Sequence, residues 1–416
     1  MSFSISSAAQ QAKKAARQIA SLTAGQKNQL LSNIAEALVD NTPAILAANK
    51  KDLMAGQENG LDAAMLDRLG LDPKRIQDIA KAVIEIAGQA DPVGSISKIE
   101  RMPSGIQVGK MRIPLGVIAM IYESRPNVTI DAAALCLKAG NAVVLRGGKE
   151  AIHSNLALAE CIKSALAKQQ LDPAAVVVVP DPDRAVMNEL MTLNESIDLI
   201  IPRGGEGLIR FVSQNSRIPV IQHYKGVCHL YVDSAADQDK GLDILKNGKT
   251  QRTGVCNSLE TLVVHKDIAA SFLPKAAAML AEHNTLVHAC ENSIGYFSGA
   301  QPATEDDWHA EYLAMEIAVR VVDDFEQAIA HIEEYSSGHT EVIVSQDYSK
   351  TQAFIRRINS AVVMANASSR FSDGGQLGLG AEIGISTSKL HAYGPMGAES
   401  LTTEKFIVMG DGEVRI

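Results

Sequence analysis

One cysteine has neighbours that suit it to nucleophilic chemistry. Cys256 follows Gly254 in a break between an expected helix and an expected strand, and Lys249 and Arg252 lie just upstream. Nearby positive charge lowers a thiol pKa and raises the fraction of thiolate, which is the nucleophilic form. Cys256 is therefore a candidate nucleophile, although a single cysteine is more often an ordinary packed residue. The other cysteines are explained as core residues of helices, the head of a strand or a loop position: Cys136, Cys161, Cys228 and Cys290.

Two glycine-rich turns follow apolar segments that we expect to be strands. The first contains Arg146 and Lys149 around two glycines, and the second contains Gly204 and Gly205. In open parallel sheets, ligands bind at the carboxyl ends of the strands, and the N-terminus of the following helix favours anions. The turns therefore predict a site for a phosphate-bearing cofactor. The alternative is a pair of loops with surface charges, because neither turn has the Gly-x-Gly-x-x-Gly spacing.

The sequence predicts no metal site. None of the ten histidines stands in a ligand spacing such as His-Glu-x-x-His, and the pair of His288 and Cys290 is too small a ligand set. The acidic run Glu305-Asp306-Asp307 could attract a divalent cation. Such a run is more commonly a solvated cap at the N-terminus of a helix.

Alternating strands and helices are expected to position these residues. Residues 1–90 show helical spacing of apolar residues with few breakers, which predicts about four helices. Residues 97–112 alternate around a Pro-Ser-Gly turn and predict a hairpin. Short apolar strands then alternate with helices in two stretches, which indicates βαβ units and parallel sheets. The expected strands are 115–121, 142–145, 176–179, 199–201, 229–232, 261–264, 317–322, 341–344 and 361–364. Residues 366–400 are expected to form a long functional loop before a final strand at 405–408.

The composition is that of a globular chain of roughly two or three domains. It has 416 residues, 46% of them hydrophobic, and a net charge of −9 from 39 basic and 48 acidic residues. The acidic balance argues against nucleic-acid and membrane-surface binding, and no apolar run approaches the length of a membrane span. Sparse cysteines favour a reducing compartment, so we expect a cytoplasmic protein. The acid-poor start could be a transit peptide, but its apolar spacing favours a first surface helix.

Several longer motifs, spread over nearly the whole chain, carry a family resemblance. They are PLGVI at 114–118, YESRPNVT at 122–129, KAGNAVVLRGG at 138–148, KTQR at 249–252 leading into GVCN at 254–257, PATEDDW at 302–308 and NASSRFSDGGQ at 366–376. Together they resemble the γ-glutamyl phosphate reductase family of the aldehyde dehydrogenase superfamily. The last two motifs are specific to that reductase rather than to the superfamily.

The resemblance implies an aldehyde-dehydrogenase-like fold of two α/β domains and a small β flap. It places an NADP(H)-binding domain at 1–96 and 113–227, a catalytic domain at 228–400, and a flap for oligomer contacts at 97–112 and 401–416. The implied reaction is NADPH-dependent reduction of L-glutamyl 5-phosphate to glutamate 5-semialdehyde and phosphate, the second step of proline synthesis from glutamate. The implied partners are this small-molecule substrate, further copies of the chain and, transiently, glutamate 5-kinase.

The resemblance also assigns roles to individual residues. Cys256 aligns with the nucleophile and Asn127 with the asparagine that holds the oxyanion. The cofactor-binding candidates are Arg146, Lys149, Gly204, Gly205 and Glu311, where a lysine at 149 suits the 2′-phosphate of NADP(H) and Glu311 would hold the nicotinamide ribose. The substrate-binding candidates are Lys249, Arg252, Ser369 and Arg370; surface ion pairs are the alternative for the three cations. The sequence departs from the common family pattern at Thr253, Val255 and Tyr393.

One segment bears on the kind of reaction. Aldehyde dehydrogenases that hydrolyse their thioester carry a glutamate base in a Glu-Leu-Gly-Gly-Lys motif, whereas the matching stretch at 222–226 reads Gln-His-Tyr-Lys-Gly. The missing carboxylate favours phosphate-dependent chemistry over oxidation to an acid. Two alternatives stay open: a hydrolytic NAD(P)-dependent aldehyde dehydrogenase, and a non-catalytic protein that retains the fold.

Overall fold

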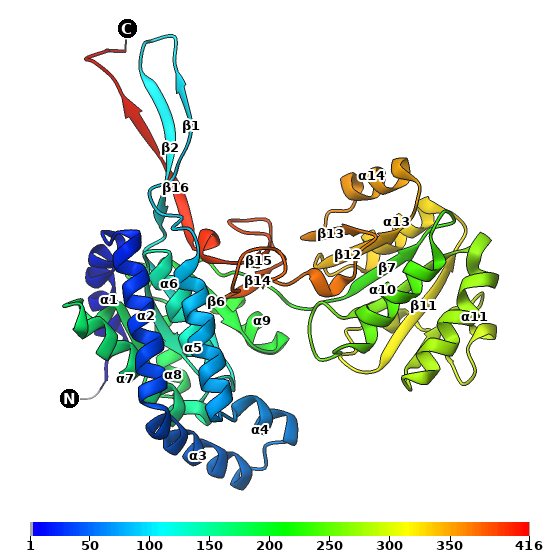
Figure 1. The fold of residues 1–416 in the computed structure, drawn as a ribbon, viewed down its shortest axis with the longest axis horizontal. Coiled ribbons are helices and arrows are strands. Elements are labelled where there is room, and N and C mark those ends of the chain that lie inside the picture. The colour runs from blue at the N-terminus through cyan, green and yellow to red at the C-terminus, as the bar shows by residue number, and fades with distance from the viewer. Residues whose placement is uncertain (1–2, 416) are drawn as a thin grey trace. The chain divides into compact units, whose positions relative to one another are not determined.

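The computed structural model describes residues 3–415, which form two compact units that each contain a parallel sheet (Figure 1). The first unit runs to Gln222 and also includes Gly378–Ile385 and the chain from Met396 onward. The second unit comprises His223–Leu377 and Ser386–Pro395. The range 228–400 predicted for a catalytic domain therefore includes two segments that belong to the first unit. An ion pair explains part of this difference, because the carboxylate of Glu382 lies 3.7 Å from the guanidinium group of Arg203 in the first unit.

Helices occupy the N-terminal part of the first unit, as the sequence predicted. There are five within residues 3–90 rather than four: α1 (Ile5–Ala20), α2 (Ala24–Asp40), α3 (Thr42–Glu58), α4 (Ala63–Leu69) and α5 (Pro73–Gly88). The side chain of Asp62 caps the short helix α4 by accepting from the backbone N–H of Met65. Helix α1 buries Ile5, Ala9 and Ile19, which confirms the expected amphipathic first helix.

The sheet of the first unit has four parallel strands in the order β5-β4-β3-β6. The strands are β3 (Val117–Tyr122), β4 (Ala142–Arg146), β5 (Val176–Val178) and β6 (Leu199–Arg203). Each strand is followed by one helix, in order α6 (Asn127–Lys138), α7 (Ile152–Lys168), α8 (Arg184–Leu190) and α9 (Glu206–Asn215). From β3 the chain continues through β4 to β5, and it then returns to form β6 on the opposite side of β3. The strand order therefore reverses between β3 and β6, the kind of place where open α/β sheets bind ligands.

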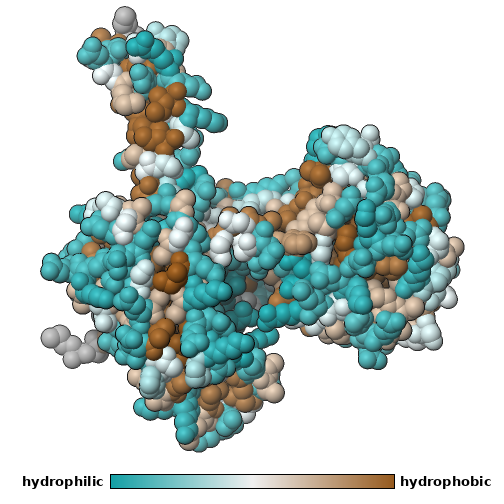
Figure 2. All heavy atoms as spheres, in the orientation of Figure 1, coloured by the Kyte–Doolittle hydropathy of each residue, from teal (hydrophilic) through white to brown (hydrophobic). Residues whose placement is uncertain are grey.

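Three antiparallel strands project from the first unit as a narrow ribbon (Figure 1). They are β1 (Ile96–Arg101), β2 (Gln107–Pro114) and β16 (Thr402–Met409), and β16 pairs with β2 along its whole length. This arrangement confirms the predicted hairpin and final strand. Figure 2 shows apolar side chains on the surface of the ribbon. The exposed apolar residues of the ribbon strands are Ile96, Ile99, Phe406, Val408 and Met409.

The second unit is built on a seven-stranded parallel sheet in the order β10-β9-β11-β8-β7-β12-β13. The strands are β7 (Cys228–Val232), β8 (Leu259–His265), β9 (Leu286–Ala289), β10 (Gln301–Pro302), β11 (Glu316–Val322), β12 (Thr340–Val344) and β13 (Val362–Ala365). The helices are α10 (Gln238–Thr250), α11 (Lys266–Glu282), α12 (Glu305–Trp308), α13 (Phe325–Tyr335) and α14 (Tyr348–Arg357). Alternate strand residues face opposite cores: Leu230 packs in one buried cluster and Tyr231 in another.

Some short elements of the second half were not predicted. Strands β9 and β10 are brief, and the expected loop at 366–400 contains β14 (Gly384–Ser386) and β15 (Gly394–Met396). Elements of two to four residues leave too little periodicity in a sequence to be recognised. The acidic run at 305–307 forms the start of α12 under a capping box from Thr304, as expected. Among the described helices, none is both long and apolar enough to cross a membrane.

Candidate active site

The candidate nucleophile lies at the edge of the seven-stranded sheet where the strands begin. Cys256 precedes β8, His223 precedes β7, and His339 immediately precedes β12. Strands β8, β7 and β12 are direct neighbours in the sheet and run parallel, so their amino ends meet at one edge. The fold therefore brings together three side chains that are far apart in the sequence.

Close packing fixes the backbone of the segment around Cys256. A methyl group at Gly226 would overlap the Cys256 carbonyl oxygen and lie 2.7 Å from the Cα of Cys256, so only glycine fits there. The thiol of Cys228 donates to the same carbonyl oxygen at 3.2 Å. The carbonyl of the next residue, Asn257, accepts a hydrogen bond from the Ser369 hydroxyl at 2.7 Å. These contacts hold the Cys256 segment against β7 and the 369–372 segment.

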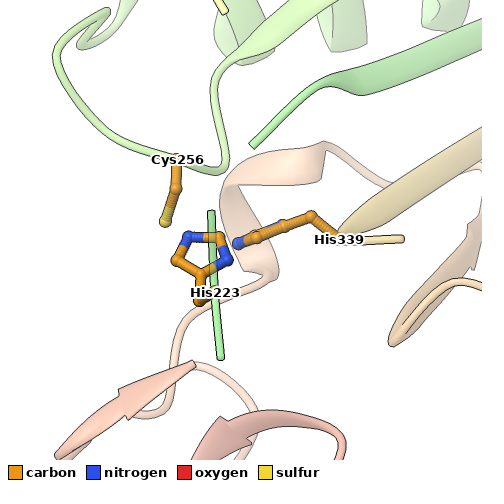
Figure 3. Close-up of side chains that lie close together, drawn as sticks. All are labelled: His223, Cys256 and His339. Atoms are coloured by element: carbon orange, nitrogen blue, oxygen red, sulfur yellow. The ribbon is translucent and has the colours of Figure 1, made fainter. Parts of the chain in front are cut away.

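Two histidine rings lie beside the thiol (Figure 3). One potential ligand atom from each of His223, Cys256 and His339 lies within 4.8 Å of the other two, and the two ring centroids are 5.2 Å apart. His339 is buried, whereas His223 and Cys256 are partly exposed. Burial lowers the pKa of His339 to about 3, and the neighbouring His223 contributes in the same direction. The His339 ring is therefore neutral at physiological pH.

Lys249 has a structural position that differs from its expected role at the substrate. Its ammonium group is buried and pairs with the buried carboxylate of Glu260 at 2.7 Å. Burial raises the pKa of Glu260 to about 7 and lowers the pKa of Lys249. A charge that is enclosed with its counterion cannot reach a ligand. We therefore assign Lys249 a structural role at the edge of the sheet that carries Cys256.

Ser369 also has a different position from the one expected. Its hydroxyl is fully buried and donates to the carbonyl of Asn257, and so it positions the Cys256 segment rather than facing a ligand. The family resemblance implied that this hydroxyl binds substrate. The tertiary structure shows that the partner of that hydroxyl is the protein backbone.

Two arginines supply positive charge beside the thiol. Arg370 donates through Nε to the side chain of Gln251 at 2.9 Å, and burial followed by the nearby charge of Arg252 lowers its pKa. The charge of Cys256 acts on Arg370 in the opposite direction. Within residues 3–415, the buried Nη1 of Arg370 has no hydrogen-bond partner. A buried guanidinium nitrogen without a partner is suited to an anionic group of a ligand.

Glu311 lies in the loop that leads from α12 to β11. Its carboxylate accepts a hydrogen bond from the backbone N–H of Gly226 at 2.9 Å, on the segment that contacts Cys256. Strand β11 is the neighbour of β8, so Glu311 belongs to the same edge of the sheet as the thiol. Its expected contact with a nicotinamide ribose stays a prediction.

The first cofactor turn lies at the carboxyl end of β4, as predicted. Arg146 is the last residue of β4 and donates to the carbonyl of Pro182 at 2.7 Å, and Lys149 is exposed in the turn that follows. Burial lowers the pKa of Arg146, and its buried Nε has no hydrogen-bond partner among the described residues. A Cβ at Gly147 would lie 3.2 Å from the Tyr122 ring, so the turn packs closely on β3. A partly satisfied arginine and an exposed lysine on a tight turn suit a phosphate-bearing dinucleotide.

The second turn offers less to an anion. Gly205 caps helix α9, and its N–H donates to the carboxylate of Glu123 at 3.1 Å. A Cβ at Gly204 would lie 2.5 Å from the same carboxylate. A protein carboxylate therefore already uses the helix N-terminus at which we expected cofactor phosphate.

Asn127 is the first residue of α6 in the first unit. Its amide donates to the carboxylate of Asp131 at 2.9 Å. Burial raises the pKa of Asp131 to about 6, and the hydrogen bond from Asn127 acts against that rise. The hydrogen bond fixes the orientation of the amide, which is what an oxyanion donor requires.

His223 and His339 are functional candidates that the sequence reasoning did not select. His223 lies in the stretch where hydrolytic relatives carry their glutamate base, and this was the one available signal. His339 had no comparable signal, because only the adjacency of β7 and β12 brings it to the thiol. The other cysteines are as predicted: Cys136 and Cys161 are buried in helices, Cys228 begins β7, and all five cysteines are free thiols.

Comparison with known proteins first defines the class. The chain belongs to the aldehyde dehydrogenase family, whose model matches residues 3–292. This confirms the predicted aldehyde-dehydrogenase-like α/β fold, and the family fold implies a nicotinamide cofactor.

Particular relatives then narrow the comparison. The γ-glutamyl phosphate reductase of Colwellia psychrerythraea is 62% identical over 414 residues, which cover 99% of both chains. That of Idiomarina loihiensis is 59% identical over 406 residues, or 98% of this chain and 97% of the relative. A crystal structure of γ-glutamyl phosphate reductase from Thermotoga maritima has a TM-score of 0.97 at 42% identity and covers 99% of this chain and 100% of that chain.

Proposed function

We infer that this protein is an NADPH-dependent γ-glutamyl phosphate reductase that converts L-glutamyl 5-phosphate to L-glutamate 5-semialdehyde and phosphate. This reaction is the second step of proline biosynthesis from glutamate. The observation that carries the inference is a partly exposed thiol on a rigid segment, with two arginines beside it. Full-length similarity to reductases of this name supports the same conclusion.

Cys256 acts as the nucleophile in the proposed mechanism. Its thiolate attacks the acyl carbon of the acyl phosphate, a carbon–sulfur bond forms, and the bond between that carbon and the phosphate oxygen breaks. The Cys256 backbone N–H holds the negative oxygen of the tetrahedral intermediate, and the family resemblance assigns the Asn127 amide to the same role. One such donor contributes about 3 kcal/mol to the transition state. Phosphate leaves, and a thioester on Cys256 remains.

Arg370 and Arg252 provide the positive charge that the substrate needs. The substrate carries a phosphate and an α-carboxylate, while the protein as a whole has a net charge of −9. The unpartnered Nη1 of Arg370, among the residues that the structure describes, is the better placed of the two cations for a charge-assisted hydrogen bond.

Arg146 and Lys149 are proposed to bind the adenosine end of the cofactor. An exposed lysine at 149 favours NADP(H) over NAD(H), because it attracts the additional 2′-phosphate. When bound, the cofactor would supply the hydride that reduces the thioester to the aldehyde. Glu311 would hold the nicotinamide ribose, and the Gly204–Gly205 turn would let the cofactor approach the sheet closely.

The stretch at 222–226 favours reduction over hydrolysis. It contains His223 and no carboxylate, so the base that activates water in hydrolytic aldehyde dehydrogenases is missing from this position. The thioester is then available to hydride or to returning phosphate rather than to water.

The same assignment leads to proposals for the oligomeric state, the cellular location and a protein partner. The exposed apolar residues of the β1–β2–β16 ribbon are suited to contacts with a second copy of the chain, so we propose a homo-oligomer. A biosynthetic enzyme with free cysteines fits the cytoplasm. Transient contact with glutamate 5-kinase would protect an unstable acyl phosphate in transit.

The reverse reaction tests the function directly, because the forward substrate is unstable. Glutamate 5-semialdehyde and NADP⁺ are supplied with and without inorganic phosphate, and NADPH absorbance is followed for the wild type and for Cys256→Ala. We expect activity that requires phosphate and is lost in the variant. Activity without phosphate would instead support the hydrolytic alternative, and a folded protein with no activity under either condition would support the non-catalytic one.

A further inference from the structure

The three side chains at the sheet edge have the chemistry of a metal-ligand set. A thiol and two imidazoles belong to the groups that bind Zn²⁺ in proteins, and three protein ligands leave a fourth position open. His223, Cys256 and His339 are 33 and 83 residues apart in the sequence, so no ligand-spacing motif could reveal them. Figure 3 shows the sulfur and the two rings converging on one small region.

The hydrogen bonds of His339 leave the correct nitrogen available to a metal. Nδ1 lies 2.8 Å from the hydroxyl oxygen of Thr340, and that hydroxyl donates its own hydrogen to Ser372. The hydroxyl can therefore only accept from His339, which places the ring proton on Nδ1 and a lone pair on Nε2. His339 is 1% exposed, and within the described part of the chain its buried Nε2 has no hydrogen-bond partner. Metal-binding histidines commonly donate their other ring N–H in this way.

We propose that His223, Cys256 and His339 form a Zn²⁺ site that reversibly blocks the nucleophile. On binding, a sulfur–zinc bond replaces the sulfur–hydrogen bond of Cys256 and one proton is released to solvent; no electron is transferred. The sulfur lone pair then bonds to the ion and cannot attack an acyl carbon. The site thus makes enzyme activity sensitive to free zinc.

The dimensions of the cluster are compatible with such an ion. Tetrahedral zinc with Zn–S near 2.3 Å and Zn–N near 2.1 Å holds its ligand atoms about 3.4 to 3.6 Å apart. The present ligand atoms lie within 4.8 Å of one another, so closure requires side-chain movements of about 1 Å. His223 and Cys256 are partly exposed and can make these movements, while buried His339 provides a fixed point.

Both carboxylates and guanidinium groups surround the three side chains, and the carboxylates on the sheet side favour a bound cation. The carboxylates of Glu341 and Glu311 both act on the thiol of Cys228, which also contacts His339 at 3.7 Å, whereas the charge of Glu260 is already compensated by Lys249. The positive charge of Arg370 opposes the binding of a cation. A dication bound by a thiolate has a net charge of only +1, which the carboxylates of Glu341 and Glu311 can compensate.

Metal binding by the full-length protein, without substrate or cofactor, tests the proposal. Reduced protein in phosphate-free buffer is titrated with Zn²⁺ against a colorimetric chelator, and separately with Co²⁺, whose absorption reports thiolate ligation. The variants are Cys256→Ser, His223→Asn and His339→Gln. His153→Asn is the matched control, because His153 is an exposed histidine of the first unit.

We expect one zinc per chain in the wild type and in the control, and at least a tenfold loss of affinity in each ligand variant. The cobalt complex should show a thiolate band that Cys256→Ser lacks. Thr340→Val removes the acceptor that orients His339 and should weaken binding by about 10- to 100-fold, the usual effect of losing an outer-shell partner. Zinc should also inhibit wild-type turnover, and a chelator should restore it.

Ligand variants that bind zinc as tightly as the wild type, or a cobalt complex without a thiolate band, would overturn the proposal. If His339→Gln fails to fold, the partly exposed His223 decides the question, since His223→Asn leaves the core intact. The binding readout is independent of the proposed reaction. Failure of the reductase assay would therefore leave a measured zinc site standing, and the absence of zinc binding would leave the reductase function untouched.

Discussion

Replacement of Gly226 by alanine should disrupt catalysis without touching a reactive group. Gly226 lies just before β7 and packs on the backbone of Cys256. The added methyl would overlap the Cys256 carbonyl oxygen and lie 2.7 Å from both its carbonyl carbon and its Cα. Because these neighbours are backbone atoms, the clash cannot be relieved by a change of rotamer.

The size of the effect follows from this geometry. Carbon atoms in contact are normally about 3.5 to 4.0 Å apart, so the Cys256 backbone or the 223–226 segment must shift by about 1 Å. A misplacement of that size in a catalytic group lowers kcat by about 100-fold. The same overpacking should reduce the free energy of unfolding by about 1 to 3 kcal/mol, which leaves a protein of this size folded at 25 °C.

The assay is the phosphate-dependent reverse reaction, together with the rate of thiol alkylation and urea unfolding. Gly295→Ala is the matched control, because a Cβ at Gly295 in the same unit meets no described atom within 4 Å. We expect normal activity in the control and a loss of kcat with intact folding in Gly226→Ala. A folded Gly226→Ala enzyme with wild-type kcat would refute the reasoning, since it would show that the position of the Cys256 backbone is not constrained by this contact.

Three further predictions concern the neighbouring groups. Ser369→Ala removes the buried donor to the Asn257 carbonyl and should lower the free energy of unfolding by about 1 to 3 kcal/mol, with a fall in kcat; an unchanged urea midpoint would contradict it. Arg370→Gln should raise the KM for phosphate in the reverse reaction by at least tenfold with a smaller change in kcat, as measured by phosphate titration, and an unchanged KM would remove Arg370 from the anion site. The raised pKa of buried Asp131, about 6 against an ordinary 3.8, means that the folded state binds the proton more tightly, so this group destabilises the fold as pH rises from about 4 to 6. Unfolding curves should show a loss of up to about 3 kcal/mol over that range in the wild type that Asp131→Asn lacks, and parallel pH profiles would show that the carboxyl titrates normally.

Local patterns were sufficient for the regular elements. The alternation of short apolar strands with helices predicted the two parallel sheets, and the Pro-Ser-Gly turn predicted the β1–β2 hairpin. These features depend on the periodicity and turn chemistry of neighbouring residues, which a single sequence displays. These signals are weak in the brief strands β9 and β10 and in the seven-residue helix α4.

Site residues were predictable to different degrees. Cys256 had a local signal, a cationic neighbourhood after a glycine, and the Arg146 turn had another at the end of a strand. Lys249 and Ser369 were expected to bind substrate, but their partners in the structure are Glu260 and the Asn257 carbonyl. Residue type alone does not reveal whether a polar group points to a ligand or to the protein.

The sequence by itself determined the class of fold, the family and the candidate nucleophile, because periodicity and motifs are present in consecutive residues. The tertiary structure alone decided what surrounds that nucleophile. Parallel pairing of β8, β7 and β12 brings three strand beginnings to one edge and so places His223 and His339 beside Cys256. Strand order is set by the packing of whole units around buried cores, and no short stretch of sequence contains it.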